Sequence, residues 1–238
     1  LFDIDGTLVL CGQQIRGIFS SAMEAVFGTT GDIDNYRFAG RTDDGIVYDL
    51  MTGVGLSERR IEDLLPEFSR HYLDRLEKDL DRDHMRLLPG VGELLERLVS
   101  RPDVTVGLLT GNWERGARTK LSRFDLNRYF GFGAFGDGCR SRDELPPVAL
   151  ERARHVAGDR ISPERTIIVG DSVLDVRCAQ AHGIASLAVA TGFVPAEDLE
   201  AAGADWVVAD LNAAGDCHPA LAAAEGRSVD LPDRAPGE

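Results

Sequence analysis

Lysine is almost missing from this sequence: Lys78 and Lys120 are the only two among 26 basic residues, against 40 acidic ones. The resulting formal charge of −14 argues against a protein that binds nucleic acid or anionic membranes. No apolar run approaches the roughly 18 residues of a membrane span, and no signal-peptide pattern opens the chain. We therefore expect a cytoplasmic protein, and any anion site in it must be local.

Paired cysteines are also missing. The four cysteines are scattered along the chain, at Cys11, Cys139, Cys178 and Cys217. None of them forms a CxxC or finger-like spacing, so the simplest interpretation is four reduced thiols rather than disulfides or a zinc site.

Short apolar runs and helical patterns alternate through the second half of the 238-residue chain. The runs at 104–109, 166–169, 185–190 and 206–209 are typical of strands buried on both faces. Leu1–Ile4 has the same character, and we expect this first strand to begin before Leu1. The alternation predicts an α/β protein with a Rossmann-like parallel sheet.

The stretch after the first strand differs, because it shows helical patterns (18–27, 44–53 and 58–81) and no strand. Such an interruption is typical of an inserted helical domain. We predict a core of residues 1–12 and 85–225 and a helical cap of residues 13–84. Residues 226–238 are rich in proline, glycine and charge, which predicts a disordered tail.

Two carboxylates, Asp3 and Asp5, lie at the end of the first strand, and Gly6 permits a sharp turn after them. Side chains two positions apart share one face of a strand, so the pair can converge on one site. Burying two anions is costly unless a cation or a proton compensates, and Mg²⁺ is a suitable cation. An exposed turn contains the same residue types, so this motif alone is only moderately specific.

The strand at 104–109 is followed by Thr110, Gly111 and Asn112, which open a helix. A hydroxyl and free backbone N–H groups at a helix N-terminus favour phosphate binding. Taken alone, ordinary capping of the helix by Thr110 or Asn112 explains them better.

A third strand, 166–169, leads to Asp171, and Asp175 lies about one helical turn later on the same side. Acidic residues at a helix start also favour the helix dipole, so this pattern has an ordinary explanation too. The three patterns together predict more. Ligand sites of open parallel sheets lie at the carboxyl ends of the strands, where all three patterns occur.

The order DxDGT, Thr-Gly-Asn after a strand, and GDxxxD resembles the haloacid dehalogenase superfamily. The segments 88–91 (Leu-Pro-Gly-Val) and 38–43 (Phe-Ala-Gly-Arg-Thr-Asp) resemble its phosphoglycolate-phosphatase-like branch. The likeness extends from Phe2 to about Asp210. It implies a Rossmann-like core with a helical cap of the C1 type.

The resemblance also implies a magnesium-dependent phosphatase that forms an aspartyl-phosphate. Asp3 attacks phosphorus, while Asp5 protonates the leaving alcohol and later activates water. Mg²⁺ is held by the Asp3 side chain, the Asp5 carbonyl and Asp171, with Asp175 in support. The phosphoryl group is bound by Thr110, Gly111 and Asn112.

The family also has a cation, usually lysine, between its second and fourth motifs, but no lysine lies between 120 and 171 here. We expect Arg142 to take this role, with Arg140 as the second choice, because arginine binds phosphate bidentately. Lys120 lies roughly 10 Å along its helix from the phosphate end. We expect it on a solvated helix face.

Arg41 follows Gly40 in the helical cap, and we predict that it binds substrate together with Thr42 and Asp43. Alternatively, these three residues simply form the N-terminus of a helix in that domain, which explains them equally well. Trp113 packs either against the cap or substrate, or simply in the core. Lys78, the only lysine of the cap, lies in a charged helix, which disfavours Schiff-base cleavage of phosphonates.

The presence of Asp5 favours phosphorus chemistry over the dehalogenase reaction. Two alternatives remain: a phosphomutase of the β-phosphoglucomutase type, and a non-catalytic protein on the same fold. We expect a small phosphorylated metabolite as substrate, no nucleic-acid or membrane partner, and a monomer or homodimer.

Overall fold

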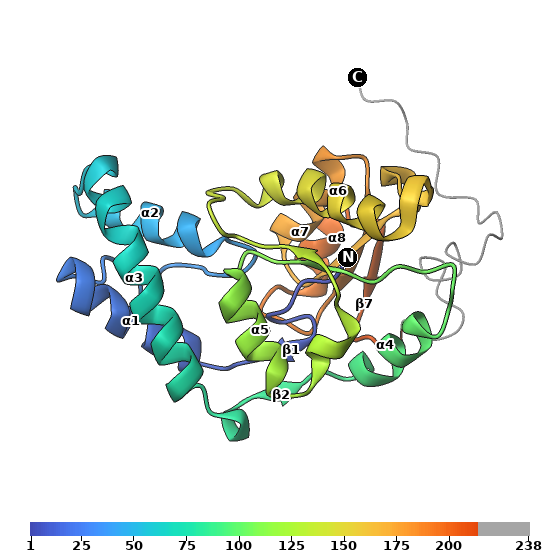
Figure 1. The fold of residues 1–238 in the computed structure, drawn as a ribbon, viewed down its shortest axis with the longest axis horizontal. Helices are drawn as coiled ribbons and strands as arrows, with labels where there is room; N and C mark the ends of the chain where they lie inside the picture. Colours follow the sequence, from blue (N-terminus) through green and yellow to red (C-terminus); the bar gives the residue numbers. More distant parts are fainter. Residues whose placement is uncertain (214–238) are drawn as a thin grey trace.

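The computed structural model describes residues 1–213, so the predicted tail and the last predicted core residues lie outside the described part (Figure 1). The helices are α1 (Gln14–Phe27), α2 (Asp43–Gly53), α3 (Glu58–Asp79), α4 (Val91–Val99), α5 (Glu114–Ser122), α6 (Leu145–Ala157), α7 (Val173–Ala181) and α8 (Ala196–Ala201). The strands are β1 (Val9–Leu10), β2 (Arg86–Leu87), β3 (Leu108–Leu109), β4 (Gly133–Ala134), β5 (Ile167–Gly170), β6 (Ala185–Val189) and β7 (Trp206–Val208).

The N-terminal residues lie in the middle of a parallel sheet. Phe2 bridges Leu108 on one side and Val169 on the other, both in parallel. Its N–H donates to the Gly107 carbonyl at 2.9 Å, and the Asp3 N–H donates to the Val169 carbonyl at 2.9 Å. With the pairs β3–β4 and β5–β6–β7, this gives the order β4, β3, residues 1–3, β5, β6, β7. The predicted parallel α/β core is confirmed.

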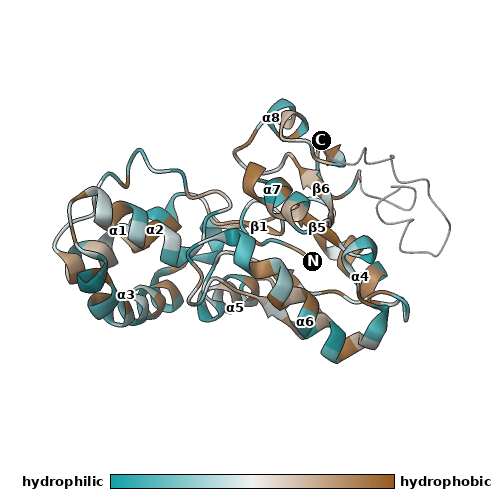
Figure 2. Cartoon of the chain, turned by 90° about the horizontal axis from the view of Figure 1, so that it is seen from above, coloured by the Kyte–Doolittle hydropathy of each residue, from teal (hydrophilic) through white to brown (hydrophobic). Residues whose placement is uncertain are grey.

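The insertion is helical, as predicted. Helices α1, α2 and α3 lie together to one side of the sheet (Figures 1 and 2). Helices α1 and α3 share an aromatic cluster, in which the ring of Phe19 lies 5.0 Å from that of Phe68 and 4.9 Å from that of Tyr72. Ser57 accepts a hydrogen bond from the Arg60 N–H and caps the start of α3. We call residues 13–84 the cap, and these boundaries stay a prediction.

The chain enters and leaves the cap through neighbouring strands. β1 and β2 pair antiparallel, with Val9 opposite Leu87 and Leu10 opposite Arg86. Neither this pair nor α8 was predicted, because two-residue strands and a six-residue helix leave almost no periodic pattern. The pairing brings the two chain connections between core and cap side by side.

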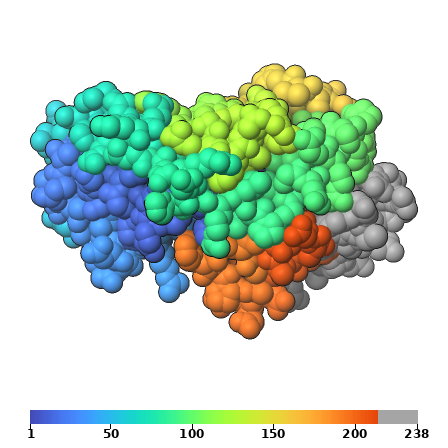
Figure 3. All heavy atoms as spheres, turned by 90° about the horizontal axis from the view of Figure 1, so that it is seen from below, coloured from blue at the N-terminus to red at the C-terminus, as the bar shows by residue number. Residues whose placement is uncertain are grey.

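The predicted strand 104–109 is shorter than expected, because only Leu108–Leu109 is in strand form, and its neighbour β4 is equally short. Each still ends at the same edge of the sheet. Figure 3 shows the cap as a blue to cyan lobe beside the green middle part and the orange C-terminal elements. Within residues 1–213, no helix is long and apolar enough to cross a membrane.

Candidate active site

Three carboxylates meet at the carboxyl edge of the sheet. Asp3 follows the central strand, Asp171 follows β5, and Asp175 lies in the first turn of α7. One oxygen of each lies within 4.8 Å of the others, and all three side chains are buried. Three residues predicted from two separate motifs are thus brought into one cluster, which we call the carboxylate cluster.

Arg142 is the cation of this cluster. Its Nη2 lies 3.1 Å from Asp3 Oδ1, forms an ion pair with Asp175 Oδ1 and donates to the Leu109 carbonyl at 3.0 Å. Arg142 is the first residue of a short helical turn, Arg142–Glu144, which Ser141 caps. Of the two arginines considered, Arg142 is the one that the structure brings to the carboxylates.

Arg140 lies elsewhere. Its guanidinium is exposed and pairs with Glu58 at 2.9 Å and Glu62 at 3.1 Å, both on α3. It also covers the ring of Tyr48, at 3.5 Å from the centroid. Arg140 therefore joins the core to the cap and does not reach the carboxylate cluster.

The cluster carries more negative than positive charge, with three carboxylates around one guanidinium. Burial raises the pKa of Asp3 to about 6, because Asp175 and Asp5 add to the effect and Arg142 only partly opposes it. Burial also raises the pKa of Asp171 well above its ordinary value, and Asp3 and Asp175 reinforce this. A buried, oxygen-only donor set with excess negative charge fits a divalent cation such as Mg²⁺.

Asp5 lies outside that cluster and has its own cation. Its Oδ2 lies 2.6 Å from Lys120 Nζ and accepts a hydrogen bond from Asn112 Nδ2 at 2.8 Å. Lys120 Nζ also donates to Asn112 Oδ1 at 2.5 Å. The lysine is 1% exposed, so the expectation that it lies on a solvated helix face was wrong.

The position of Lys120 within α5 explains this error. Trp113, Ala117 and Leu121 are spaced by four residues, and all are buried. Lys120 lies seven positions after Trp113, on the same helical face, and its long side chain points back toward the helix N-terminus. Helical periodicity was the signal that could have located it, whereas distance along the axis was misleading.

Thr110 and its neighbours form a fully buried loop beside Asp5. Thr110 Oγ1 accepts from Asn112 Nδ2 at 2.8 Å, and Thr110 has no exposed surface. Gly111 is required here, because a Cβ atom would lie 2.0 Å from the Arg41 carbonyl oxygen. The loop is thus in direct contact with the cap.

Arg41 itself does not enter this arrangement. Its guanidinium is exposed, pairs with Asp49 at 2.9 Å and lies over the ring of Tyr36. Its role in substrate binding stays a prediction. The neighbouring Thr42 caps α2 by accepting from the Gly45 N–H at 3.1 Å, so the alternative of a capped helix start describes part of this segment.

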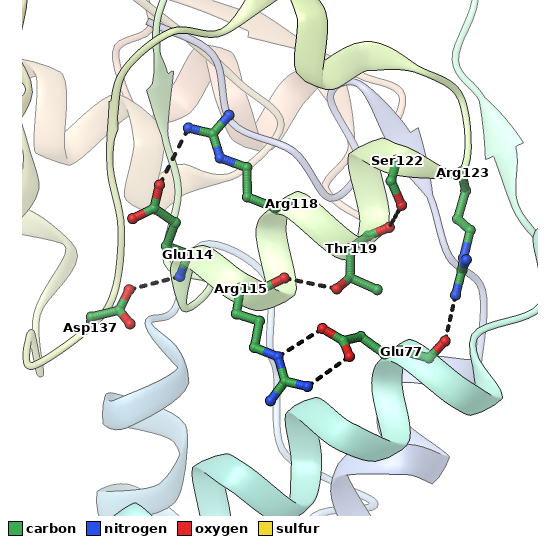
Figure 4. Close-up of a pocket in the computed structure, with 8 residues that line it drawn as sticks. All are labelled: Glu77, Glu114, Arg115, Arg118, Thr119, Ser122, Arg123 and Asp137. Carbon is green, nitrogen blue, oxygen red and sulfur yellow. Dashed lines mark hydrogen bonds and ion pairs between the residues drawn. The ribbon is translucent and has the colours of Figure 1, made fainter.

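The larger of two cavities described for residues 1–213 lies elsewhere, between α3 and α5 (Figure 4). It has a volume of about 790 Å³ and is lined largely by charged side chains. Among them, Arg115 forms paired hydrogen bonds with Glu77, each 2.7 Å long. None of the predicted site residues lines it, so we assign the chemistry to the carboxyl edge of the sheet.

A parallel α/β core with an acidic centre at its carboxyl edge and a helical insertion defines a broad class of enzymes. The sequence model of the haloacid dehalogenase-like hydrolases matches residues 1–189. The chain therefore belongs to that family.

Individual relatives agree. A phosphoglycolate phosphatase from Chromobacterium violaceum is 30% identical over 87% of this chain and 90% of its own length. The crystal structure of CbbY from Rhodobacter sphaeroides in complex with phosphate has a similar fold, with a TM-score of 0.68 at 20% identity over 90% of this chain and 94% of that one. The fold is also similar to that of a Thermotoga maritima chain provisionally assigned as a β-phosphoglucomutase. The TM-score is 0.58 at 24% identity, and the match covers 90% of this chain and 96% of that one.

Proposed function

We propose that the protein is a cytoplasmic, magnesium-dependent phosphatase that hydrolyses a small phosphate monoester through an aspartyl-phosphate. The carboxylate cluster with Arg142 carries this proposal, because Asp3 lies buried beside a compensating guanidinium at the sheet edge. The adjoining Thr110 loop offers a hydroxyl and backbone N–H groups for a phosphoryl group. Membership in the hydrolase family supports it.

In this mechanism an Asp3 oxygen attacks phosphorus and the ester oxygen leaves. Asp5 gives that oxygen a proton and then takes one from the water that hydrolyses the intermediate. Arg142 orients Asp3 and offsets part of the charge around it. Thr110, Gly111 and Asn112 bind the transferring group, and most of the rate acceleration comes from positioning and charge stabilisation.

Mg²⁺ would be held by the Asp3 side chain, the Asp5 carbonyl and Asp171, with Asp175 beside them. When bound, it would neutralise the phosphate oxygens and the excess carboxylate charge. Both oxygens of Asp175 already have partners. Its Oδ2 accepts hydrogen bonds from the Ser172 N–H and hydroxyl, and its Oδ1 forms an ion pair with Arg142. We therefore give Asp175 a supporting role.

We propose a small phosphorylated metabolite as the substrate, of the kind that the named relative from Chromobacterium violaceum hydrolyses. The test is phosphate release from a panel of small esters, phosphoglycolate and sugar phosphates included, with Mg²⁺ or with EDTA. Asp3→Asn should abolish release, whereas Asp159→Asn, an exposed acid of the core, should leave it unchanged.

The other outcomes identify the alternatives. Isomerised sugar phosphate without net phosphate release would favour a phosphomutase. A folded protein with no chemistry on any ester and no affinity for Mg²⁺ would favour a non-catalytic role. Full activity of the Asp3→Asn variant would contradict the proposal itself.

A further inference from the structure

Trp113 belongs to the core by sequence but to the cap by its surroundings. It directly precedes α5, and its indole is 4% exposed. The ring lies 5.9 Å from those of Phe68 and Tyr72, both on α3 and both in the aromatic cluster of the cap. The side chain that follows the Thr110–Asn112 loop is therefore embedded in the other unit.

Two acidic residues of the cap hold this tryptophan. Its backbone N–H donates to Asp43 Oδ2 at 2.8 Å, and its indole Nε1 donates to Asp44 Oδ1 at 2.6 Å. In return, the Asp43 N–H donates to the Gly111 carbonyl at 2.8 Å. Three hydrogen bonds thus join the first turn of α2 to residues 111–113.

These contacts leave no room for adjustment. A Cβ on Gly111 would meet the Arg41 carbonyl, and a Cβ on Gly40 would lie 2.3 Å from Ser172 Oγ, next to Asp171. The cap segment 40–44 is therefore packed against two of the three loops at the carboxyl edge. A shift of this segment must move the loops or break the contacts.

Asp43 also completes α5. Trp113 is the N-cap residue of that helix, and in a capping box its backbone N–H would be bound by the N3 side chain. N3 is Gly116, which has no side chain, so the Asp43 carboxylate accepts this hydrogen bond instead. Both aspartates are buried, at 6% and 5% exposure. Burying a carboxylate is costly unless it gains partners, so this pair points to a specific contact rather than an incidental one.

We propose that Asp43 and Asp44 are positioning residues of the active site, which hold the 110–113 loop in its working geometry by anchoring Trp113. The effect reaches the chemistry through Asn112, which bonds Thr110, Asp5 and Lys120. The phosphate-binding loop is then correctly formed only while the cap is docked. This inference rests on the proposed phosphatase function.

Kinetics provide the first test. Asp43→Ala and Asp44→Ala should each lower kcat/KM about 10- to 100-fold, with both kcat and KM affected, because misplaced binding groups act on both. Asp43→Asn keeps an acceptor oxygen and should recover most of the loss. Asp63→Ala, an exposed acid on α3, should match the wild type.

Fluorescence provides a second test that does not need activity. The chain has only two tryptophans, so Trp206→Phe leaves Trp113 as the single reporter. In that background, Asp43→Ala and Asp44→Ala should shift the emission to longer wavelength and increase quenching by acrylamide, because the indole becomes hydrated. Asp3→Asn should leave the emission unchanged.

The outcomes separate the two proposals. Alanine variants with wild-type emission and wild-type kinetics would overturn the positioning role, whatever reaction the enzyme performs. An active Asp3→Asn variant would overturn the proposed function and leave the fluorescence result standing. If an alanine variant fails to fold, Asp43→Asn and Trp113→Phe take its place. Trp113→Phe removes only the indole donor to Asp44 and should raise KM. An unchanged KM in this variant would count against the inference.

Discussion

Arg142 and Lys120 are both buried beside carboxylates at the sheet edge, but their surroundings differ. Arg142 lies among Asp3, Asp171 and Asp175, all of which belong to the core. Lys120 contacts Asp5 and Asn112, and the Asp43 carboxylate of the cap acts on it as well. Both cations reach the cap, since Arg142 Nη1 donates to the Gly40 carbonyl at 3.4 Å. The carboxylates around Arg142 all come from the core, whereas a cap carboxylate also acts on Lys120.

The charge balance differs as well. The Arg142 surroundings hold an excess of carboxylates, and burial raises the pKa of Asp3 and of Asp171 there. At Lys120, burial acts to lower the pKa of the ammonium, but Asp5 and its other neighbours outweigh this and raise it. The first site therefore needs a further cation to be fully ionised, while the second is satisfied by its own residues.

The largest effect should come from removing Arg142. Arg142→Met leaves buried carboxylates without a partner and should lower the free energy of unfolding by about 3–5 kcal/mol without Mg²⁺. Urea unfolding measures this. Arg142→Lys keeps the charge and should lose less; equal losses in the two variants would show that packing, not charge, dominates there.

Mg²⁺ should stabilise the protein next most strongly, and more at pH 7.5 than at pH 5. The pKa of Asp3 is raised from 3.8 to about 6, so the folded state binds more protons than the unfolded state in that window. Without Mg²⁺, stability from this group is therefore lost as pH rises from about 4 to 6. Mg²⁺ binds the ionised form, and at 100 times its Kd it adds about 2.7 kcal/mol.

Thermal unfolding at both pH values, with Mg²⁺ or EDTA, measures this difference. Asp171→Asn should remove most of the Mg²⁺ effect. An equal gain at pH 5 and pH 7.5 would contradict the assignment of the metal to raised-pKa carboxylates.

Removing Lys120 should cost less than removing Arg142. The side chain of Asp5 is 39% exposed, so water can solvate its carboxylate once the lysine is gone. We expect Lys120→Met to lower the free energy of unfolding by about 1.5 kcal/mol. Lys78, the other lysine, is exposed, so Lys78→Met should leave the free energy of unfolding unchanged. A larger loss of stability for Lys120→Met than for Arg142→Met would reverse the comparison.

The smallest effect belongs to the exposed cation Arg140. Its pairs with Glu58 and Glu62 lie at the surface, so Arg140→Gln should lower stability by less than about 1 kcal/mol. Added salt should erase most of this difference, because exposed ion pairs are screened. Thermal unfolding at low and high ionic strength measures it, and a loss independent of salt would point to the packing on Tyr48 instead.

Much of the fold could be predicted from sequence, because the relevant patterns are local. Helix α2, Asp43–Gly53, starts within one residue of its predicted range, 44–53, since its apolar residues repeat with helical spacing. The carboxylates Asp3 and Asp171 could be placed at one edge because each directly follows a buried strand. The β1–β2 pair could not, since its register depends on contacts between residues far apart in the chain.

The sequence by itself determined which side chains stand at the ends of the strands: Asp3, Thr110 and Asp171 follow from strand position alone. Only the tertiary structure decided which cations reach them. Arg140 and Arg142 differ by two positions, yet one faces the cap surface and the other the carboxylates. Lys120 and Trp113 lie on a helix face whose burial depends on where the cap docks. Distant packing decides such choices, and no local pattern encodes it.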